Sequence, residues 1–328
     1  MKSISILNKI TLLLMGWYCC CTPACKKDES PRTPAITSIV QYIRNTPELN
    51  MLKTAVERAH ADTLFDKGGP YTFFAPTDSA FLKAGWTIDK INAYDPSALS
   101  LILRYNIAQG RINSTELFGF FTEDLLVLHP TYRPSITKNY HGIYFNGAKV
   151  IKADIVAGEG VIHELDRLIL PPVGNILEAI EAQPDLTYMS SFFNRMITAR
   201  DLILNNQVTI LAPTDSAWKV YGIASPEDFS KRDTSFLYDN FIRFCIQAGP
   251  HFSSEFLDGF NLFGFSSPFG NPFDHIILIA ETDNGLLGVY PGSSGQVGNL
   301  TPPALIRTDI TGANGVLHVL DQVFLNPY

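Results

Sequence analysis

The stretch FFAPTDSAF at residues 73–81 returns as ILAPTDSAW at residues 210–218. Six consecutive residues, Ala-Pro-Thr-Asp-Ser-Ala, are identical in the two stretches, and an aromatic residue follows them each time. β-prone residues that end at a proline predict a short strand at the start of each stretch. The Thr-Asp pairs at 77–78 and 214–215 are typical of helix N-caps, because their side-chain oxygens accept from free backbone N–H groups. The stretch therefore predicts a strand end, a turn and a capped helix, formed twice.

The match between the two halves of the chain extends beyond this motif. In chain order, the further matched blocks are 47–49 with 184–186, 105–110 with 244–249, 114–117 with 253–256, and 160–166 with 315–321. The offset is 137 to 139 residues up to the third of these blocks and 155 residues in the last, so the second copy carries 16 more residues between Phe256 and Gly315. A period near 140 residues indicates two whole domains rather than an array of small repeats.

The coarse pattern within each copy predicts an α+β fold. Residues 38–59 and 97–105 of the first copy have helical spacing, whereas 142–155 is typical of strand and turn, with Asn146-Gly147 as a hairpin signal. Residues 161–170 predict a closing strand. Helices therefore come early in the copy and strands late, which is the order of an α+β domain.

Both copies resemble fasciclin-type adhesion domains. The front motif of that family is represented by residues 74–78 and 211–215. Its closing Asn-Gly-Val-Ile-His motif is represented by residues 160–166 and 314–321, and in the first copy Glu159 takes the place of the usual Asn. Both motifs occur in the same order in each copy, which makes the resemblance specific.

The resemblance implies a division of the chain at the Pro171-Pro172 pair. It implies two tandem fasciclin-like domains, residues 36–172 and 173–328, each a wedge-shaped β-sandwich flanked by helices, and a role in extracellular adhesion or matrix-type binding. The family's Tyr-His pair is not kept, because Asn106 and Cys245 stand where the His would be. The integrin binding associated with that pair in animal members is therefore not expected here.

The first residues predict a lipoprotein signal peptide, residues 1–24. A positive start and a short apolar stretch at 10–18 lead to Ala24-Cys25 and a polar continuation, which resembles a bacterial lipoprotein cleavage site. Cys25 is therefore the expected lipidation site, at the start of a tether, residues 25–35. The protein is expected to be lipid-anchored in the outer membrane, at the cell surface of a Gram-negative bacterium. The alternative is an ordinary secretory signal with incidental cysteines.

No catalytic, cofactor or metal site is expected from the sequence. His163 and Asp166, like His318 and Asp321, are three residues apart on a predicted strand, so their side chains point to opposite faces and cannot share the hydrogen bond of a catalytic triad. The remaining histidines lack metal-ligand spacing. We expect His163 and His318 to bond backbone groups near the closing strand. The formal net charge of −7 argues against a nucleic-acid partner.

A run of phenylalanines marks the second copy. Seven lie within residues 252–273, interrupted by glycines and prolines, and we interpret the run as a Phe-rich insertion of domain 2. One interpretation is that the run extends the core or packs against the first copy. The other is an exposed patch that binds a partner, since aromatic residues dominate binding surfaces. Its candidate residues are Phe260, Phe263, Phe265 and Phe269.

These observations predict a cell-envelope lipoprotein that acts in adhesion or in binding an extracellular partner, rather than an enzyme. The partner is expected to be an extracellular or envelope protein or a glycan, and the lipid anchor supplies the membrane contact. The alternative left open is an accessory subunit of an outer-membrane nutrient-uptake or glycan-handling complex.

Overall fold

The computed structural model describes residues 37–66, 69–117, 121–230, 245–257, 261–263, 276–281, 287–291 and 302–323. Cys25 and three of the four phenylalanine candidates, Phe260, Phe265 and Phe269, lie outside these ranges. The fourth, Phe263, is the last residue of strand β10, and the structure describes only its backbone.

Helices precede most of the strands in the first copy, as the sequence predicts. The helices are α2 (Ile39–Asn45), η1 (Pro47–Leu49), α3 (Asn50–Arg58), η2 (Asp62–Phe65), α4 (Asp78–Lys83), α5 (Ile88–Ala93) and α6 (Pro96–Tyr105). The helix predicted over residues 38–59 is interrupted, because Pro47 holds Thr46 in an extended conformation (φ −100°, ψ 114°) and starts a 3-10 turn. The α+β class is confirmed.

The strands of the first copy form one seven-stranded sheet in the order β2-β1-β7-β6-β5-β4-β3. They are β1 (Tyr71–Pro76), β2 (Ile107–Gln109), β3 (Phe121–Asp124), β4 (Ser135–Asn139), β5 (Gly142–Phe145), β6 (Ala148–Ala157) and β7 (Gly160–Leu165). The first and last long strands, β1 and β7, pair in parallel, from Tyr71 opposite Gly160 to Pro76 opposite Leu165. The predicted hairpin turn is present, since Asn146 (φ 46°) and Gly147 (φ 74°) both have the positive φ that a tight β-turn of this kind needs.

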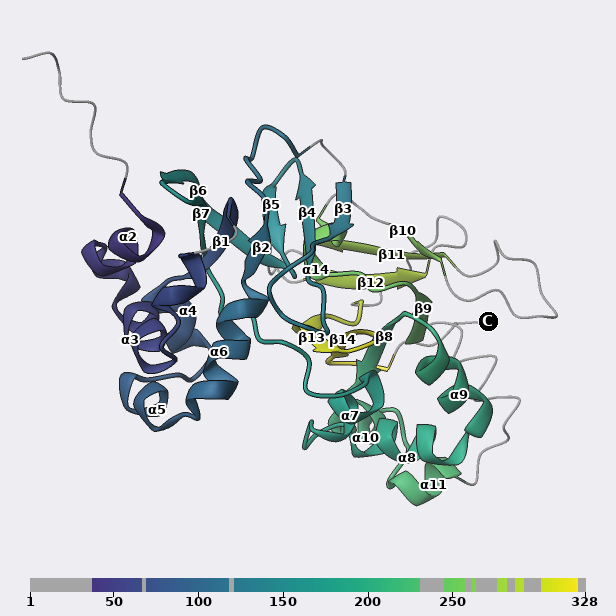
Figure 1. Ribbon diagram of the computed structural model, residues 1–328. Coiled ribbons are helices and arrows are strands. Elements are labelled where there is room, and N and C mark those ends of the chain that lie inside the picture. Colours follow the sequence, from purple (N-terminus) through teal and green to yellow (C-terminus); the bar gives the residue numbers. More distant parts are fainter. Residues whose placement is uncertain are drawn as a thin grey trace, which may run out of the picture. The chain divides into compact units, whose positions relative to one another are not determined.

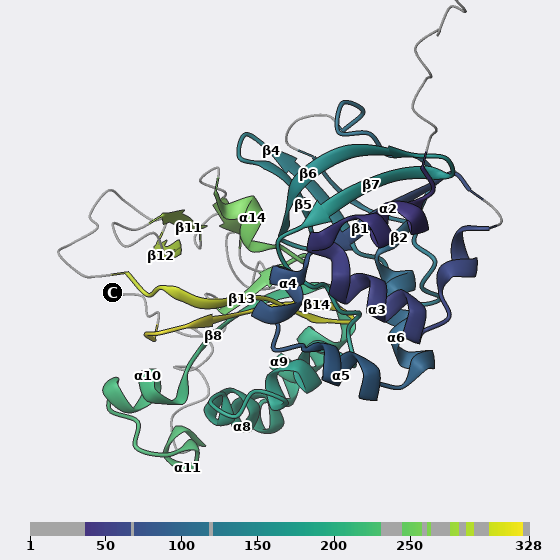
Figure 2. The ribbon, with the colours of Figure 1, turned by 90° about the vertical axis from the view of Figure 1, so that its left-hand side faces the viewer.

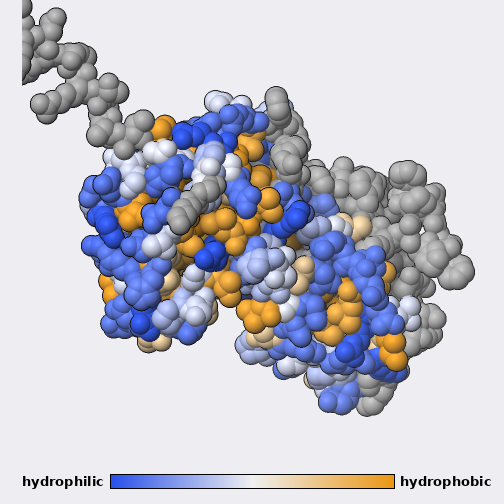
Figure 3. Space-filling model, viewed as in Figure 1, coloured by the Kyte–Doolittle hydropathy of each residue, from blue (hydrophilic) through white to orange (hydrophobic). Residues whose placement is uncertain are grey.

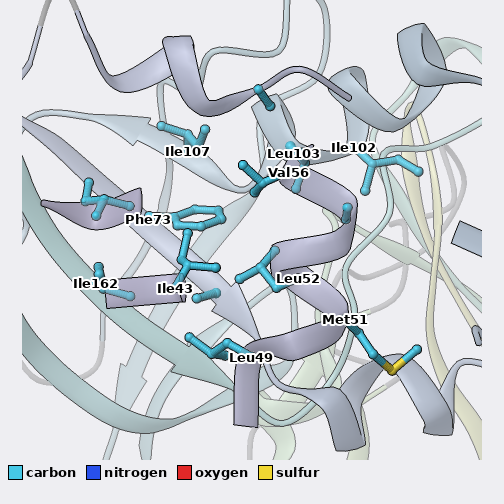
Figure 4. Packing of buried hydrophobic residues seen from close by; sticks show 14 of the residues in the cluster. Ile43, Leu49, Met51, Leu52, Val56, Phe73, Ile102, Leu103, Ile107 and Ile162 are labelled. Atoms are coloured by element: carbon cyan, nitrogen blue, oxygen red, sulfur yellow. The ribbon is translucent and has the colours of Figure 1, made fainter. Parts of the chain in front are cut away.

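The two faces of β1 and β7 are buried in two different cores. Helices α2 to α6 cover one face (Figures 1 and 2), where side chains such as Phe73 and Leu52 pack together in the cluster drawn in Figure 4. On the other face, Phe74 of β1 stacks on Phe145 of β5, with ring centroids 4.1 Å apart. Strands β4 to β6 thus fold back over the central pair, which gives the copy a sandwich of strands with helices outside it.

The second copy repeats this arrangement. In the described part of this copy the helices are α7 (Ile176–Glu181), α8 (Thr187–Arg195), α9 (Ile197–Asn205), α10 (Asp215–Val220), α11 (Pro226–Ser230) and α14 (Ser253–Phe256). Its strands are β8 (Val208–Pro213), β9 (Ile246–Ala248), β10 (Asn261–Phe263), β11 (Ile276–Glu281), β12 (Leu287–Pro291), β13 (Leu305–Gly312) and β14 (Gly315–Leu320). Strands β8 and β14 pair in parallel as β1 and β7 do, within the order β13-β14-β8-β9, and β10-β11-β12 form a separate sheet.

The extra residues of the second copy lie mainly after its phenylalanine run. Two residues, 146–147, join β5 to β6, whereas thirteen, 292–304, join β12 to β13. Two residues, 140–141, join β4 to β5, whereas five, 282–286, join β11 to β12. These two connections hold fourteen of the sixteen extra residues.

The glycine of each closing motif is required by the parallel strand pair. A Cβ atom at Gly160 would lie 1.9 Å from the carbonyl oxygen of Tyr71, and one at Gly315 would lie 2.1 Å from that of Val208. No side chain fits at such a distance from a backbone atom. The closing motif therefore begins with glycine because the neighbouring strand passes directly over that position.

Candidate functional site

The Thr-Asp pair of the front motif caps two different helices. Thr77 precedes α4 and its hydroxyl accepts from the backbone N–H of Ala80 at 3.4 Å. Asp78 accepts from the backbone N–H of Met51 at 2.7 Å, at the start of α3. The N-cap residue of α3 is Leu49, which has no side-chain acceptor of its own. The Asp therefore supplies a cap from a distance, which the sequence did not predict.

The second copy uses the same two residues in the same way. The hydroxyl of Thr214 accepts from the N–H of Ala217 at 3.2 Å. Asp215 accepts from the N–H of Tyr188 at 3.1 Å and from the hydroxyl of Thr187 at 2.7 Å, at the start of α8. The repeated hexapeptide is thus explained by a strand end and two helix caps.

Glu159 and the matching Asn314 also perform one task with different side chains. Glu159 accepts from the N–H of Ile39, the first residue of α2, at 2.8 Å. Asn314 accepts from the N–H of Ile176, the first residue of α7, at 2.9 Å. The departure of the first copy from the family motif therefore keeps the hydrogen bond, because either side chain presents an oxygen to the helix start.

His163 holds a bulge in the neighbouring strand of the first copy. Its Nδ1 accepts from the backbone N–H of Asp154 at 3.2 Å and its Nε2 donates to the carbonyl of Ile112 at 2.8 Å. Asp154 lies in β6 with a left-handed backbone (φ 59°) and accepts from the backbone N–H of Ser114 at 2.7 Å and from its hydroxyl. The predicted backbone-bonding role of His163 is confirmed.

The second copy contains the same hydrogen-bonded His-Asp-Ser group, which we call the clamp. His318 accepts at Nδ1 from the N–H of Asp309 at 3.4 Å and donates at Nε2 to the carbonyl of His251 at 2.9 Å. Asp309 (φ 62°) accepts from the N–H and the hydroxyl of Ser253 at 2.7 and 2.6 Å. The role predicted for His318 is confirmed as well. A clamp formed twice by matching residues is a feature of the fold.

The clamp also sets the charges of its members. Burial lowers the pKa of His163 and of His318, so both imidazoles are neutral near pH 7. Burial alone would raise the pKa of Asp309, but the charges nearby, Arg167 included, and the Ser253 hydrogen bonds outweigh it, and the pKa is lowered. A neutral histidine therefore lies beside an ionised carboxylate in a structural, not a reactive, arrangement.

The geometry does not assemble a catalytic triad from the motif residues. Asp166 follows the end of β7 and accepts from the backbone N–H of Lys149 at 2.8 Å, and not from His163. The hydroxyl of Ser79 bonds that of Thr77 at 3.1 Å. Among the described residues, no group of three or more His, Cys, Asp or Glu side chains could hold a metal ion.

The residues at the family's Tyr-His position are buried. Asn106 is 1% exposed and donates to the carbonyls of Ile102 and Ile169, at 2.8 and 3.1 Å. Cys245 of the second copy is a free thiol, 1% exposed, in the apolar core. Neither residue presents its side chain to a partner.

Side chains from both copies meet within one compact unit, Thr37–Tyr328. The guanidinium of Arg167 donates to the carboxylate of Asp309 at 2.8 Å, and the Asp309 side chain is only 2% exposed. The amide of Asn139 donates to the carbonyl of Ser254 at 2.7 Å. Asp309, which belongs to the clamp of the second copy, thus also forms an ion pair with Arg167 of the first copy.

Two cavities lie beside these contacts. One, of about 530 Å³, is lined by the segment after β7, by α7 and by β13. The other, of about 370 Å³, is lined by polar residues of the first copy and by the segment around Gly312 and Phe252 of the second. Both volumes fall within the range of small-molecule sites, roughly 300–1,000 Å³. Figure 3 shows apolar residues gathered in the centre of an otherwise largely hydrophilic face.

Comparison with known proteins identifies the domain type. A sequence model of the Fasciclin domain matches residues 47–171. Protein sll1483 of Synechocystis sp. is 31% identical over 143 residues, which are 43% of this chain and 77% of that protein. The chain belongs to the fasciclin domain family.

Two further comparisons of this fasciclin chain cover most of its length. Fasciclin-1 of Drosophila melanogaster is 22% identical over 325 residues, which are 90% of this chain, and the match spans about half of that protein, 48%. The solved FAS1 domain pair from the insect cell adhesion molecule Fasciclin I is 17% identical, with a TM-score of 0.39, and the match covers 85% of this chain and 97% of that one.

Sequence reasoning missed the acidic members of the fasciclin chain's clamps. The offset of 155 residues that aligns the closing motifs also aligns Asp154 with Asp309, each followed by an isoleucine. Ser114 and Ser253 already belong to a matched block. Following the repeat backwards from the closing glycines would therefore have found the clamp, whereas the Arg167 ion pair leaves no repeated signal.

Proposed function

We propose that this protein acts in adhesion, or in binding an extracellular partner, as a lipid-anchored protein of the cell envelope. The observation that carries the proposal is the fasciclin domain itself, present with its motifs twice in one chain. Fasciclin-1 of Drosophila melanogaster matches 90% of this chain. The solved FAS1 domain pair comes from an insect cell adhesion molecule. The motif polar groups Thr77, Asp78 and His163 are all used to hold the fold, so recognition is assigned to surfaces outside the motifs.

The anchor in this proposal is a lipid on Cys25, and the site is the outer membrane of a Gram-negative bacterium. Among the described residues, the first helix begins at Ile39, fourteen residues after Cys25. In the part of the chain that the structure describes, no helix is long and apolar enough to cross a bilayer. In this proposal the stretch that follows Cys25, with Pro31 and Pro34, is a tether that holds the body of the protein off the membrane.

The anchor is tested by feeding cells a fatty-acid analogue and following the label in the Cys25→Ser variant. We expect Cys25→Ser to lose both the label and the membrane fraction. The matched control is Cys245→Ala, which removes the buried thiol and should keep both. Unchanged labelling of Cys25→Ser would contradict the anchor.

Adhesion is tested separately with beads that carry the purified full-length protein. We expect these beads to aggregate or to attach to cells more than albumin-coated beads do. If they do neither, and the protein instead co-purifies with an outer-membrane uptake complex, the adhesion proposal is wrong.

The phenylalanines Phe260, Phe263, Phe265 and Phe269 are proposed as partner contacts. Replacing all four by Ser separates the two interpretations, because core phenylalanines each contribute about 3–5 kcal/mol and their loss would unfold the copy. Exposed contacts would leave the melting temperature nearly unchanged and reduce attachment. A stable quadruple variant that attaches normally would exclude a binding role for this run.

A further inference from the structure

A row of hydrogen-bonded polar side chains forms one wall of the smaller cavity. The hydroxyl of Ser135 donates to Asp124 Oδ1 at 2.9 Å, and the backbone N–H of Ser135 donates to Asn146 Oδ1 at 2.7 Å. The amide of Asn146 donates to the hydroxyl oxygen of Tyr105 at 2.9 Å. All four residues line the cavity. The wall is therefore fixed by the protein before any ligand binds.

The two ends of this row have unused hydrogen-bonding capacity. Tyr105 is 2% exposed and accepts through its oxygen, and no described residue accepts the proton of its hydroxyl. Burial raises the pKa of Tyr105 well above its usual range, so the phenol keeps this proton. At the other end, Asp124 Oδ2 accepts no hydrogen bond from the described residues. The wall thus offers one buried donor and one carboxylate acceptor to the cavity.

The rim of the cavity adds a cation, an aromatic ring and an amide. Arg133 is exposed, and its guanidinium has no partner among the described residues. The ring of Tyr132 is half-buried and stacks on His129, with centroids 5.2 Å apart. Gln207 of the second copy is exposed and also lines the cavity.

The lining of the cavity also includes apolar residues. Pro172, Phe252 and Val316 contribute to it, and Phe252 and Val316 are 5% and 1% exposed. A ligand in the cavity would therefore meet both hydrogen-bonding groups and carbon. A carboxylate and a guanidinium in the same small space disfavour a ligand of either net charge.

We propose that this cavity binds a neutral pyranose unit, either as a free monosaccharide or as part of a glycan. A sugar ring carries hydroxyls that both donate and accept, which Asp124, Tyr105 and Arg133 require, and it has a C–H face that packs on an aromatic or apolar surface. The cavity volume of about 370 Å³ suits one ring. This inference rests on the proposed binding function and names the chemical class of its ligand.

Saturation-transfer NMR and calorimetry with the full-length protein test the inference. The probes are glucose, galactose, mannose and N-acetylglucosamine, with glucuronate and glucosamine as charged comparators. We expect at least one neutral sugar to bind and to bind better than the charged comparators. Binding of none of the four with a dissociation constant below roughly 10 mM would overturn the proposal.

Substitutions locate the binding. Asp124→Asn keeps the acceptor for Ser135 and removes the charge, and Arg133→Gln changes an exposed side chain, so neither variant should lose its fold. Each is expected to weaken sugar binding about tenfold, because a charge-assisted hydrogen bond is lost. Asp201→Asn and Arg111→Gln, which do not line the cavity, are the matched controls. Equal binding by cavity variants and controls would place the sugar elsewhere and refute the assignment.

The two proposals fail in distinguishable ways. If coated beads attach to cells but no neutral sugar binds, the adhesion function stands and the sugar assignment falls. If sugar binds and Asp124→Asn weakens that binding while beads do not attach, the cavity assignment stands and the adhesion function falls. An array of immobilised glycans compared with the free monosaccharides shows which of the two sources the cavity recognises.

Discussion

Removing the carboxylate of Asp78 should destabilise the first copy by about 1–2 kcal/mol. The backbone N–H of Met51 donates to this carboxylate at 2.7 Å, and α3 has no other side-chain cap at its start. Loss of a cap costs about 1 kcal/mol. The negative charge near the start of a helix contributes about 0.3–1 kcal/mol more. Asp78→Ala removes both contributions, whereas Asp78→Asn keeps an acceptor oxygen and should cost less than about 1 kcal/mol.

Urea unfolding followed by far-UV circular dichroism measures this difference. The slope of the transition should stay constant while its midpoint falls, since the substitution changes stability and not the surface exposed on unfolding. Asp201→Ala is the control, because Asp201 is an exposed residue of α9 whose carboxylate has no partner among the described residues. Asp78→Ala within about 0.3 kcal/mol of the wild type, or as stable as Asp78→Asn, would refute the remote cap.

Three further substitutions or conditions have expected outcomes. Gly160→Ala places a Cβ atom 1.9 Å from the Tyr71 carbonyl oxygen and should cost about 3 kcal/mol or more, read from the melting curve. At Gly85 an added Cβ meets no atom within 4 Å, so Gly85→Ala carries only the cost of its φ of 70°, about 1–2 kcal/mol. A melting temperature of Gly160→Ala as high as that of Gly85→Ala would contradict the close approach. Arg167→Gln leaves the buried Asp309 carboxylate without its cation. Since Arg167 is one-third exposed, we expect the free energy of unfolding to fall by about 1–2 kcal/mol. The control Arg195→Gln changes an exposed side chain and should leave it nearly unchanged. Burial lowers the pKa values of His163 and His318, so the unfolded chain binds more protons than the folded chain below about pH 6.5. The free energy of unfolding should therefore fall as the pH drops through that range. A free energy of unfolding that stays constant between pH 7.5 and 5.5 would argue against neutral buried histidines.

The repeated motifs predicted the central strands and turns of the fold well. The prolines that end β1 and β8, the caps at Thr77 and Thr214 and the Asn146-Gly147 hairpin all depend on residues within four positions of one another. Turns and helix caps of this kind can be predicted from the sequence because they depend only on neighbouring residues. The break at Pro47 was also readable, but the apolar spacing across it outweighed the proline in the prediction.

Contacts between distant residues could not be read in the same way. Asp78 lies 27 positions from Met51, and Arg167 lies 142 from Asp309. Only the folded backbone brings these partners together. The cavity wall has the same origin, since Tyr105, Asp124 and Asn146 come from three separate elements. The polar row that carries the ligand proposal therefore leaves no pattern in the sequence.

The parallel pairing of the first and last long strands in each copy has a consequence for how the chain is made. β1 cannot form its parallel hydrogen bonds until β7, 89 residues later in the chain, has been synthesised. During synthesis β7 emerges before β8 and β14 exist, so β1 meets its own partner before a similar strand can compete. Refolding of the whole chain exposes both of these similar strand pairs at once. Strand exchange between copies, or between molecules, is then open to a chain whose order of synthesis otherwise prevents it.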